Sequence, residues 1–300
     1  MELLQPADKD LEIWEGSVES PTFILTFSGL DRPGIIHAVT TFLLEKGCNI
    51  RQHQQFDDTE NGTLHGRTSF TGPVGLATET LADDFLDTAS WFGLTYNFYD
   101  QKAPQLLVMV SKAGHCLNDL IFKDRNGQLG GEVALVVSNH EDLRPMAESA
   151  GLPFVHIPVQ PDTKEAAEAR LLELVEQYNI DLVVLARYMQ VLSDDLCRKL
   201  EGRAINIHHS FLPGFKGARP YHQAHSRGVK LIGATAHYVT ADLDEGPIIE
   251  QEVIRVDHTY SPKNLASVGQ DAEVLALSRA VKWHCEHRVL RDGASTVVFR

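Results

Sequence analysis

The sequence has few cysteines and no long apolar run. Its 300 residues include four cysteines that lie far apart and form no CxxC pair: Cys48, Cys116, Cys197 and Cys285. Such spacing argues against a disulfide framework and favours reduced thiols. No apolar stretch approaches the roughly 20 residues needed to cross a bilayer, and the opening MELLQPADKD lacks a signal-peptide pattern. We therefore expect a cytoplasmic protein without a membrane partner.

Positive charge is also scarce. Lysine and arginine together number 27 against 41 aspartates and glutamates, which gives a formal net charge of −14. A chain of this charge repels the phosphate backbone, so we expect no nucleic-acid partner. The length allows either two domains or one large α/β domain and does not distinguish between them.

The pattern of apolar residues up to about residue 100 predicts a small α/β domain. A strand at 22–30 and an amphipathic helix at 35–47 come first. Paired strands, a second helix and a final strand follow, at 49–58, 63–72, 75–93 and 94–100. This β-α-β-β-α-β order is ferredoxin-like. We therefore assign residues 1–100 to a first domain, with its core at about 20–100.

The turn DRPG joins the first strand to the first helix of this domain. We expect Asp31 to cap the helix, Pro33 to lie in its first turn, and Gly34 to let the backbone bend. The plainest interpretation is a well-made helix start. The longer segment DRPGIIHAVTTFLLEKGCNI also resembles an ACT domain. That resemblance implies a homo-oligomer and an amino-acid effector near Asp31, Arg32, Pro33 and Gly34.

Residues 101–300 predict a second domain built on a mostly parallel, Rossmann-like sheet. Continuous runs of valine, isoleucine and leucine alternate with helices, as expected for strands buried on both faces with right-handed crossovers. The expected strands are LLVMVS, EVALVVS, FVHIPV, DLVVLA and RAINIH. Ligands of such sheets bind beyond the carboxyl ends of the strands. The segment INIHH, residues 205–209, lies at one of these ends.

Asn206 and His208 are spaced by two residues on the edge of that strand. Their side chains therefore project the same way, while Ile207 between them points into the core. An amide NH₂ and an imidazolium NH that converge on one oxygen would stabilise the oxyanion formed when a carbonyl is attacked. The alternative is that both side chains only satisfy backbone groups at the strand end.

A candidate carboxylate follows in GATAHYVTADLDEGPIIEQ. Asp244 precedes a Gly-Pro turn that fixes the direction of the chain. There it could orient His208 and take a proton from water. Asp242 and Glu245 compete for this role, although ordinary solvated loop charges are the simpler interpretation of both. Residue types alone do not decide which of the three carboxylates has this role.

INIHHSFLPGFKGARPYHQAH followed by VTADLDEGPIIEQ is similar to the folate-dependent formyltransferase family, over about residues 104–290. The resemblance implies a catalytic trio of Asn206, His208 and Asp244. ARYMQVLS, residues 186–193, resembles the family loop whose backbone recognises the pterin ring of folate, although an apolar turn of this kind could simply be core. The resemblance places the folate contacts at Met189, Gln190, Val191, Leu192, Thr240 and Leu243.

The loop after the first strand of this domain distinguishes branches of the family. Relatives that formylate glycinamide ribonucleotide carry a Gly/Ser-rich loop that holds a phosphate. Here SKAGHCLNDL keeps only Gly114. Relatives acting on methionyl-tRNA would need a positive surface. The ACT-like unit, SKAGHCL, the double histidine HHS and GARPYHQAH together resemble the hydrolase of the family.

That resemblance implies hydrolysis of 10-formyltetrahydrofolate to formate and tetrahydrofolate, with no cofactor. The reaction would supply formate for purine synthesis and balance one-carbon folate pools. Asp244 would position and deprotonate the attacking water, while His208 and Asn206 would hold the oxyanion. His209 could close the space where an amine acceptor would sit, or only pack against the loop. Lys164 could meet the folate or be an ordinary surface lysine.

Three other functions are consistent with parts of the sequence. The first is transfer of the formyl group to glycinamide ribonucleotide, and the second is a catalytically silent folate sensor. The third is a metal-dependent deformylase, but the histidines form no HExxH helix and share no spacing with the cysteines. We therefore expect no metal at the histidines His208, His209, His222, His225 and His237.

Overall fold

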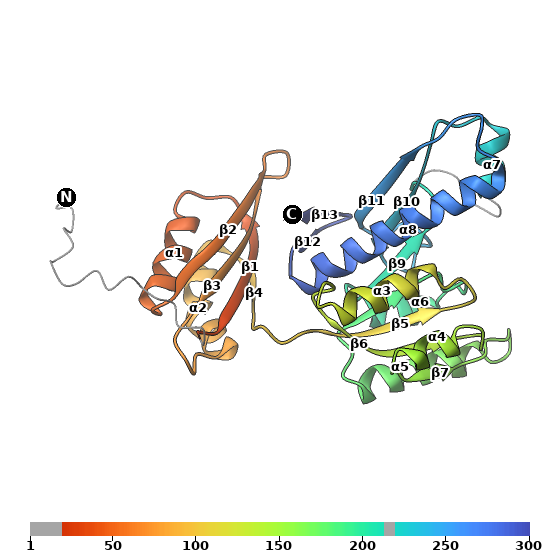
Figure 1. Ribbon diagram of the computed structural model, residues 1–300. Coiled ribbons are helices and arrows are strands. Elements are labelled where there is room, and N and C mark those ends of the chain that lie inside the picture. Colours follow the sequence, from red (N-terminus) through yellow and green to blue (C-terminus); the bar gives the residue numbers. More distant parts are fainter. Residues whose placement is uncertain (1–19, 213–219) are drawn as a thin grey trace, which may run out of the picture. The chain divides into compact units, whose positions relative to one another are not determined.

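The computed structural model describes residues 20–212 and 220–300. Residues 213–219, PGFKGAR, lie outside the described residues. The chain forms two compact units, Met1–Lys102 and Ala103–Arg300 (Figure 1). Within the described ranges, no helix is long and apolar enough to cross a membrane.

The first unit has the predicted ferredoxin-like order. Its elements are β1 (Thr22–Leu30), α1 (Ile35–Glu45), β2 (Asn49–Asp58), β3 (Thr63–Thr71), α2 (Thr78–Phe92) and β4 (Thr95–Tyr99). The four strands form an antiparallel sheet in the order β2-β3-β1-β4. The helices pack on the sheet over a core that includes the fully buried rings of Phe27, Phe70 and Phe85. The prediction of a β-α-β-β-α-β unit is thus confirmed.

The start of α1 differs from the sequence-based expectation. Gly34, with a φ of 100°, holds the capping position, and no side chain accepts a hydrogen bond there. The expected cap at Asp31 is therefore wrong. Instead the backbone N–H of Asp31 donates to the carbonyl of Gly62 at 2.9 Å, which ties this turn to the β2–β3 hairpin. Pro33 precedes the helix and does not lie in its first turn.

The second unit contains nine strands and six helices among its described residues. The strands are β5 (Gln105–Val110), β6 (Glu132–Ser138), β7 (Phe154–His156), β8 (Leu182–Leu185), β9 (Ala204–His208), β10 (Leu231–Tyr238), β11 (Ile248–Arg255), β12 (Val289–Asp292) and β13 (Ser295–Val298). The helices are α3 (His115–Arg125), α4 (Arg144–Ser149), α5 (Lys164–Gln177), α6 (Asp194–Lys199), α7 (Pro220–Ser226) and α8 (Pro262–Cys285).

Seven of these strands form one sheet in the order β11-β10-β9-β8-β5-β6-β7. From β9 to β7 all neighbours are parallel, as predicted, whereas β10 runs antiparallel to both β9 and β11. Because β10 is antiparallel to β9, the loop that follows β10 starts at the opposite edge of the sheet from the loops that follow the parallel strands. The extended pairing of β10 with β9 instead places His237 opposite Asn206.

Helices cover both faces of this sheet. One apolar cluster joins the sheet to α3, α4 and α8, and a second joins it to α5 and α6. Burial on both faces explains the continuous apolar runs in the sequence. The 24-residue α8 had no counterpart in the sequence-based prediction, although Ser261 caps it and Pro262 occupies its first turn. This Ser-Pro pair is an ordinary helix-start signal.

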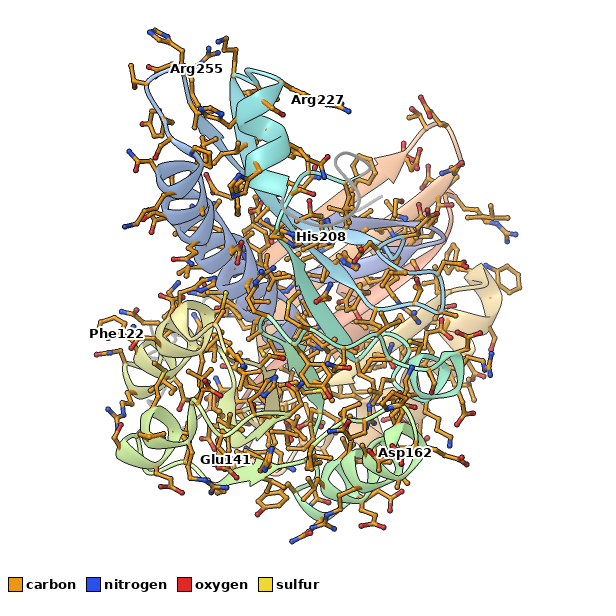
Figure 2. All side chains as sticks on the ribbon, turned by 90° about the vertical axis from the view of Figure 1, so that its right-hand side faces the viewer. Phe122, Glu141, Asp162, His208, Arg227 and Arg255 are labelled. Carbon is orange, nitrogen blue, oxygen red and sulfur yellow. The ribbon has the colours of Figure 1, made fainter. Side chains whose placement is uncertain are left out.

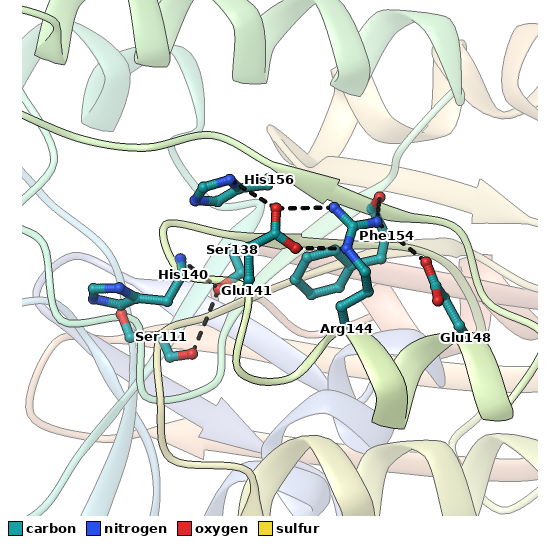
Figure 3. Close-up of polar contacts among 8 residues, drawn as sticks. All are labelled: Ser111, Ser138, His140, Glu141, Arg144, Glu148, Phe154 and His156. Carbon is teal, nitrogen blue, oxygen red and sulfur yellow. Dashed lines mark hydrogen bonds and ion pairs between the residues drawn. The ribbon is translucent and has the colours of Figure 1, made fainter.

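Polar side chains fix the loops at the carboxyl ends of β6 and β7 (Figure 3). Ser138 accepts a hydrogen bond from the backbone of His140 through its hydroxyl, at 3.1 Å. Glu141 contacts Arg144 at 2.5 Å and His156 at 2.9 Å, which joins the β6–α4 loop to β7. The loops on this side of the sheet are therefore anchored to each other.

Thr235 of β10 anchors the segment that follows β9. Its side chain is fully buried, and its hydroxyl donates to the carbonyl of Ser210 at 2.9 Å. The same oxygen accepts from the backbone N–H of Leu212 at 3.2 Å and from the Gln251 amide at 3.1 Å. One hydroxyl therefore holds residues 210–212 beside the strand end.

We expect Thr235→Val to destabilise the second unit by about 2–4 kcal/mol, because three buried polar groups lose their partner without a change in side-chain volume. Denaturant unfolding followed by the fluorescence of Trp283, which lies in this unit, measures the change. The exposed Thr95 of β4 provides the matched control, and Thr95→Val should stay within about 0.5 kcal/mol of the unsubstituted protein. Equal unfolding midpoints for the two variants would contradict the assigned role of Thr235.

Candidate active site

The carboxyl end of β9 opens into a cavity of about 310 Å³. Figure 2 labels His208 at this strand end, near the middle of the second unit. Asn206, His208 and Asp244 all line the cavity, together with His209 and Arg187. The structure thus brings the three residues implied by the family resemblance to one site.

The alternation of β9 places two of these side chains on the cavity side. Asn206 is half-buried and His208 is 9% exposed, while Ile207 between them is buried in the main apolar cluster. Both side chains therefore project from one face of the strand, as the spacing of two residues predicts.

Asp244 reaches this strand end from the loop between β10 and β11. Its Oδ2 lies 3.3 Å from Nδ1 of His208. The hydrogen bond from His208 holds the pKa of this carboxyl well below its usual range, against the effect of partial burial. Asp244 is therefore ionised throughout the physiological pH range. It adopts a φ of 58°, a left-handed conformation that is uncommon for aspartate and is often found at functional sites.

The competing carboxylates point elsewhere. Asp242 and Glu245 are both exposed, in contrast to the half-buried Asp244. Gly246 lets the loop pack tightly against β10, because a Cβ at this position would lie 1.7 Å from the carbonyl oxygen of Tyr238. The loop is thus pressed against the end of β10, and Asp244 is the carboxylate that this close approach directs toward His208.

His237 is a fourth polar residue of the site, which the sequence analysis considered only as a metal ligand. Its Nδ1 lies 2.8 Å from the backbone carbonyl of Tyr238, which can only accept, so Nδ1 carries the hydrogen. In the neutral ring Nε2 is then an acceptor, and the Nδ2 of Asn206 donates to it at 3.2 Å. His237 therefore orients the Asn206 amide, with its NH₂ group toward the imidazole and one hydrogen left for another acceptor.

His208 has one nitrogen committed and one available. Its Nδ1 faces Asp244, and its Nε2 is buried without a hydrogen-bond partner among the described residues. A buried ring nitrogen beside a cavity is well placed to contact an oxygen of a bound molecule. The site therefore offers two converging polar groups, the Asn206 amide and the His208 ring, with a carboxylate behind the ring.

His209 also borders the cavity, with its ring centroid 5.0 Å from that of His208. Burial, followed by the positive charge of Arg187 and by His208, lowers the pKa of His209 to about 4. The ring is therefore neutral at physiological pH. Both suggestions for His209, closure of the acceptor space and packing against the loop, are compatible with this position.

The rest of the cavity is mainly apolar. All six residues expected to contact folate line it: Met189, Gln190, Val191, Leu192, Thr240 and Leu243. Met189, Val191 and Leu243 are more than half exposed, so large apolar side chains are available to cover a flat ring. Ser111 anchors the loop that carries Met189. Its hydroxyl oxygen accepts a hydrogen bond from the backbone N–H of Met189 at 3.0 Å, and its hydroxyl donates to Oδ1 of Asn139 at 2.7 Å.

Lys164 does not line this cavity. It borders a smaller neighbouring pocket of about 20 Å³, and its Nζ lies 4.0 Å from Glu168. Glu168 in turn accepts hydrogen bonds from the backbone and hydroxyl of Ser193, the residue that caps α6. Lys164 and Glu168 therefore border a pocket that Gln190, Val191 and Leu192 also line.

The histidines do not form a metal-ligand cluster among the described residues. Within these residues the only set of three metal-ligand side chains with atoms within 4.8 Å of one another is His115, Cys116 and Glu273. All four cysteines are free and buried. Burial raises the pKa of Cys116 above its usual value, so this thiol stays protonated and is a poor metal ligand.

Similarity to characterised families agrees with this geometry. The family described as formyl transferase matches residues 104–281. A formyltetrahydrofolate deformylase of Corynebacterium sp. (strain P-1) is 50% identical over 284 residues, which cover 94% of this chain and 99% of that protein.

Solved structures give the same result. The crystal structure of a formyltetrahydrofolate deformylase from Burkholderia mallei has a TM-score of 0.88 and 48% identity, and the match covers 93% of this chain and all of the other. A glycinamide ribonucleotide transformylase from Symbiobacterium toebii has a TM-score of 0.62 at 30% identity, covering 68% of this chain and 97% of the transformylase. The chain therefore belongs to the formyl transferase family and, within it, to the formyltetrahydrofolate deformylases.

Proposed function

We propose that this protein hydrolyses 10-formyltetrahydrofolate to formate and tetrahydrofolate. The observation that carries the proposal is the contact of the Asp244 carboxylate with His208, beside Asn206, in a cavity whose lining is mainly apolar elsewhere. The membership in the deformylase family supports the same reaction over nearly the whole chain.

The formyl oxygen is held by the Asn206 amide and the Nε2 of His208. His237 keeps the amide hydrogen directed toward this oxygen. In this proposal His208 acts as an imidazolium, with Nδ1 donating to the ionised Asp244 and Nε2 donating to the formyl oxygen. Both donors strengthen their contact as the carbonyl becomes a tetrahedral oxyanion, because negative charge then grows on the oxygen. Stabilisation of this kind lowers the barrier to attack by water.

Asp244 also positions the attacking water. A carboxylate of such low pKa is a weak base in the free enzyme. When the oxyanion forms, it shares the positive charge of His208, so Asp244 becomes a better proton acceptor. The water oxygen then bonds to the formyl carbon, its proton passes to Asp244 and from there to N10, and the carbon–nitrogen bond breaks. Formate and tetrahydrofolate leave.

The apolar side of the cavity binds the pterin ring. The loop that carries Met189, Gln190, Val191 and Leu192 faces this space together with Thr240 and Leu243 of the opposite loop. Backbone groups of such loops provide the directional contacts, while the apolar side chains cover the faces of the ring. Lys164 borders the neighbouring pocket that this loop also lines, so a folate contact through Lys164 would run through that pocket.

We also propose a cytoplasmic enzyme that forms homo-oligomers and serves purine synthesis and one-carbon balance. The free cysteines support a reducing compartment. The ferredoxin-like first unit supports an ACT-type role, in which the turn of Asp31, Arg32, Pro33 and Gly34 contributes to an amino-acid site. No cofactor takes part in the proposed reaction, because the nucleophile is water.

Substitution of the trio tests the proposed roles. We expect Asn206→Ala to lower the turnover number for formate release by about 10²–10³, since one oxyanion donor is lost. Asp244→Asn should have at least as large an effect. Folate affinity, measured by titration with tetrahydrofolate, should change little in both variants.

Asp242→Asn is the matched control, because it removes an exposed carboxylate of the same loop. This variant should release formate at close to the original rate. Near-full activity of Asn206→Ala or Asp244→Asn, with folate binding intact, would contradict the assignment.

The buried His209 gives a pH-dependent stability. Its pKa of about 4 in the folded protein lies below the ordinary histidine value of about 6.5. The unfolded chain therefore binds the proton more readily, so the free energy of unfolding falls as the pH drops from about 6.5 to about 4. We expect His209→Gln to reduce this loss, as measured by urea unfolding at several pH values. His258→Gln, which changes an exposed histidine, should leave the pH dependence as it is.

A further inference from the structure

A buried carboxylate lies beside the active site and has no part in the mechanism above. Glu273 of α8 is 1% exposed. Its Oε2 contacts Nε2 of His115 at 2.7 Å and Nε of Arg187 at 3.2 Å, and its Oε1 accepts from the hydroxyl of Tyr221 at 3.0 Å. We call these four residues, His115, Arg187, Tyr221 and Glu273, the Glu273 cluster. They come from α3, the β8–α6 loop, α7 and α8.

The cluster is charged although it is buried. Burial alone would raise the pKa of Glu273, but the hydrogen bond from His115 and the charge of Arg187 outweigh this effect and lower it. The glutamate is therefore ionised and balanced by its neighbours. An ionised carboxylate of such low exposure is costly unless it is fully paired, so the arrangement is a specific feature of the chain.

Backbone and packing details also fix this cluster. Arg187 adopts a left-handed φ of 64°, a conformation that is unfavourable in a residue other than glycine and is held here by its surroundings. Gly269 lies one helical turn before Glu273, and a Cβ there would lie 2.0 Å from the hydroxyl of Tyr221. The glycine thus leaves the space in which the tyrosine ring reaches the carboxylate.

The cluster reaches the catalytic cavity through Arg187. Arg187 and His209 line the cavity directly, and His209 experiences the charges of both Arg187 and Glu273. His209 also borders a small pocket that is lined by Tyr221. The catalytic His208 is therefore flanked by the apolar folate loop on one side and by the polar cluster near His209 on another.

A metal ion does not explain these residues. His115, Cys116 and Glu273 have atoms close enough to share an ion. However, both oxygens of Glu273 are already occupied by protein donors, and the guanidinium of Arg187 would repel a cation. The cluster is self-neutralising and needs no ion for its charge.

We propose that the Glu273 cluster closes the acceptor side of the cavity, so that water is the only nucleophile that reaches the formyl carbon. This inference rests on the proposed hydrolysis and adds the feature that makes the enzyme a hydrolase. Within one family, a transformylase and the deformylases share a fold but differ in the acceptor that their names imply. The acceptor must therefore be selected by residues outside the trio.

The competing reaction differs only in its nucleophile. A primary amine would form a bond from its nitrogen to the formyl carbon, the carbon–N10 bond would break, and one amine proton would pass to N10. The products would be an N-formyl amine and tetrahydrofolate, in place of formate and tetrahydrofolate. The two outcomes can be counted separately in one reaction mixture.

The test measures how the formyl group is divided between water and glycinamide, a small primary amine. The full-length protein is incubated with 10-formyltetrahydrofolate and excess glycinamide, and formate, N-formylglycinamide and tetrahydrofolate are quantified against a mixture without enzyme. The unsubstituted protein should yield formate and tetrahydrofolate in equal amounts. In Glu273→Ala, which removes the carboxylate that holds Arg187 and Tyr221, the N-formylglycinamide fraction should rise about tenfold or more over that background.

A second variant alters the Glu273 cluster without removing a charge. Gly269→Ala displaces the ring of Tyr221 from α8 and should also raise the N-formylglycinamide fraction. Glu250→Ala is the matched control, because Glu250 is another buried carboxylate near an arginine, Arg279 at 4.0 Å, and lies on β11. Its product ratio should equal that of the unsubstituted protein.

The ratio of products is informative because a general loss of stability lowers both products and leaves their proportion unchanged. The proposal is overturned if folded Glu273→Ala and Gly269→Ala release formate and form no N-formylglycinamide. It is also overturned if the unsubstituted protein already formylates glycinamide. A failure of the proposed function is a different result, in which the unsubstituted protein releases no formate from 10-formyltetrahydrofolate.

Discussion

The contact between Asp244 and His208 is the interaction on which the proposed chemistry depends. The two residues lie far apart in the sequence, at the end of β9 and in the loop after β10. The antiparallel pairing of β10 with β9 brings the two segments together, and the close approach of Gly246 to Tyr238 sets the direction of the loop. The resulting distance of 3.3 Å keeps the carboxylate ionised and gives the imidazole a fixed partner.

The other residues of the site support this pair from two sides. On one side, His237 fixes the amide of Asn206 through a ring whose Nδ1 is committed to a backbone carbonyl. On the other, Arg187 and Glu273 form part of a charged wall. His237 lies on β10 and Glu273 on α8, so each support rests on regular secondary structure. The exposed apolar loop near Met189 contrasts with this and leaves room for a ring.

The sequence predicted some elements closely and missed others for physical reasons. Strands buried on both faces produce unbroken apolar runs, and β6 was located without error because its run is short and rich in valine, which favours a strand over a buried helix. The cap at Asp31 was wrong because several residues of DRPG suit a helix start, and the φ of Gly34 decided among them. The long α8 was missed because its buried and exposed residues alternate too weakly, and only the Ser261-Pro262 pair marked its beginning.

The sequence by itself determined the ferredoxin-like and parallel-sheet units. The family resemblance added Asn206, His208 and Asp244 as proposed catalytic residues and the loop of residues 189–192 as a proposed folate contact. Periodicity and short motifs are local properties, so a single chain carries them directly. Only the tertiary structure decided which carboxylate faces His208, how His237 orients Asn206, and that Glu273 gathers three partners from distant segments. Such contacts depend on strand pairing and helix packing, which join residues whose sequence separation gives no sign of their proximity.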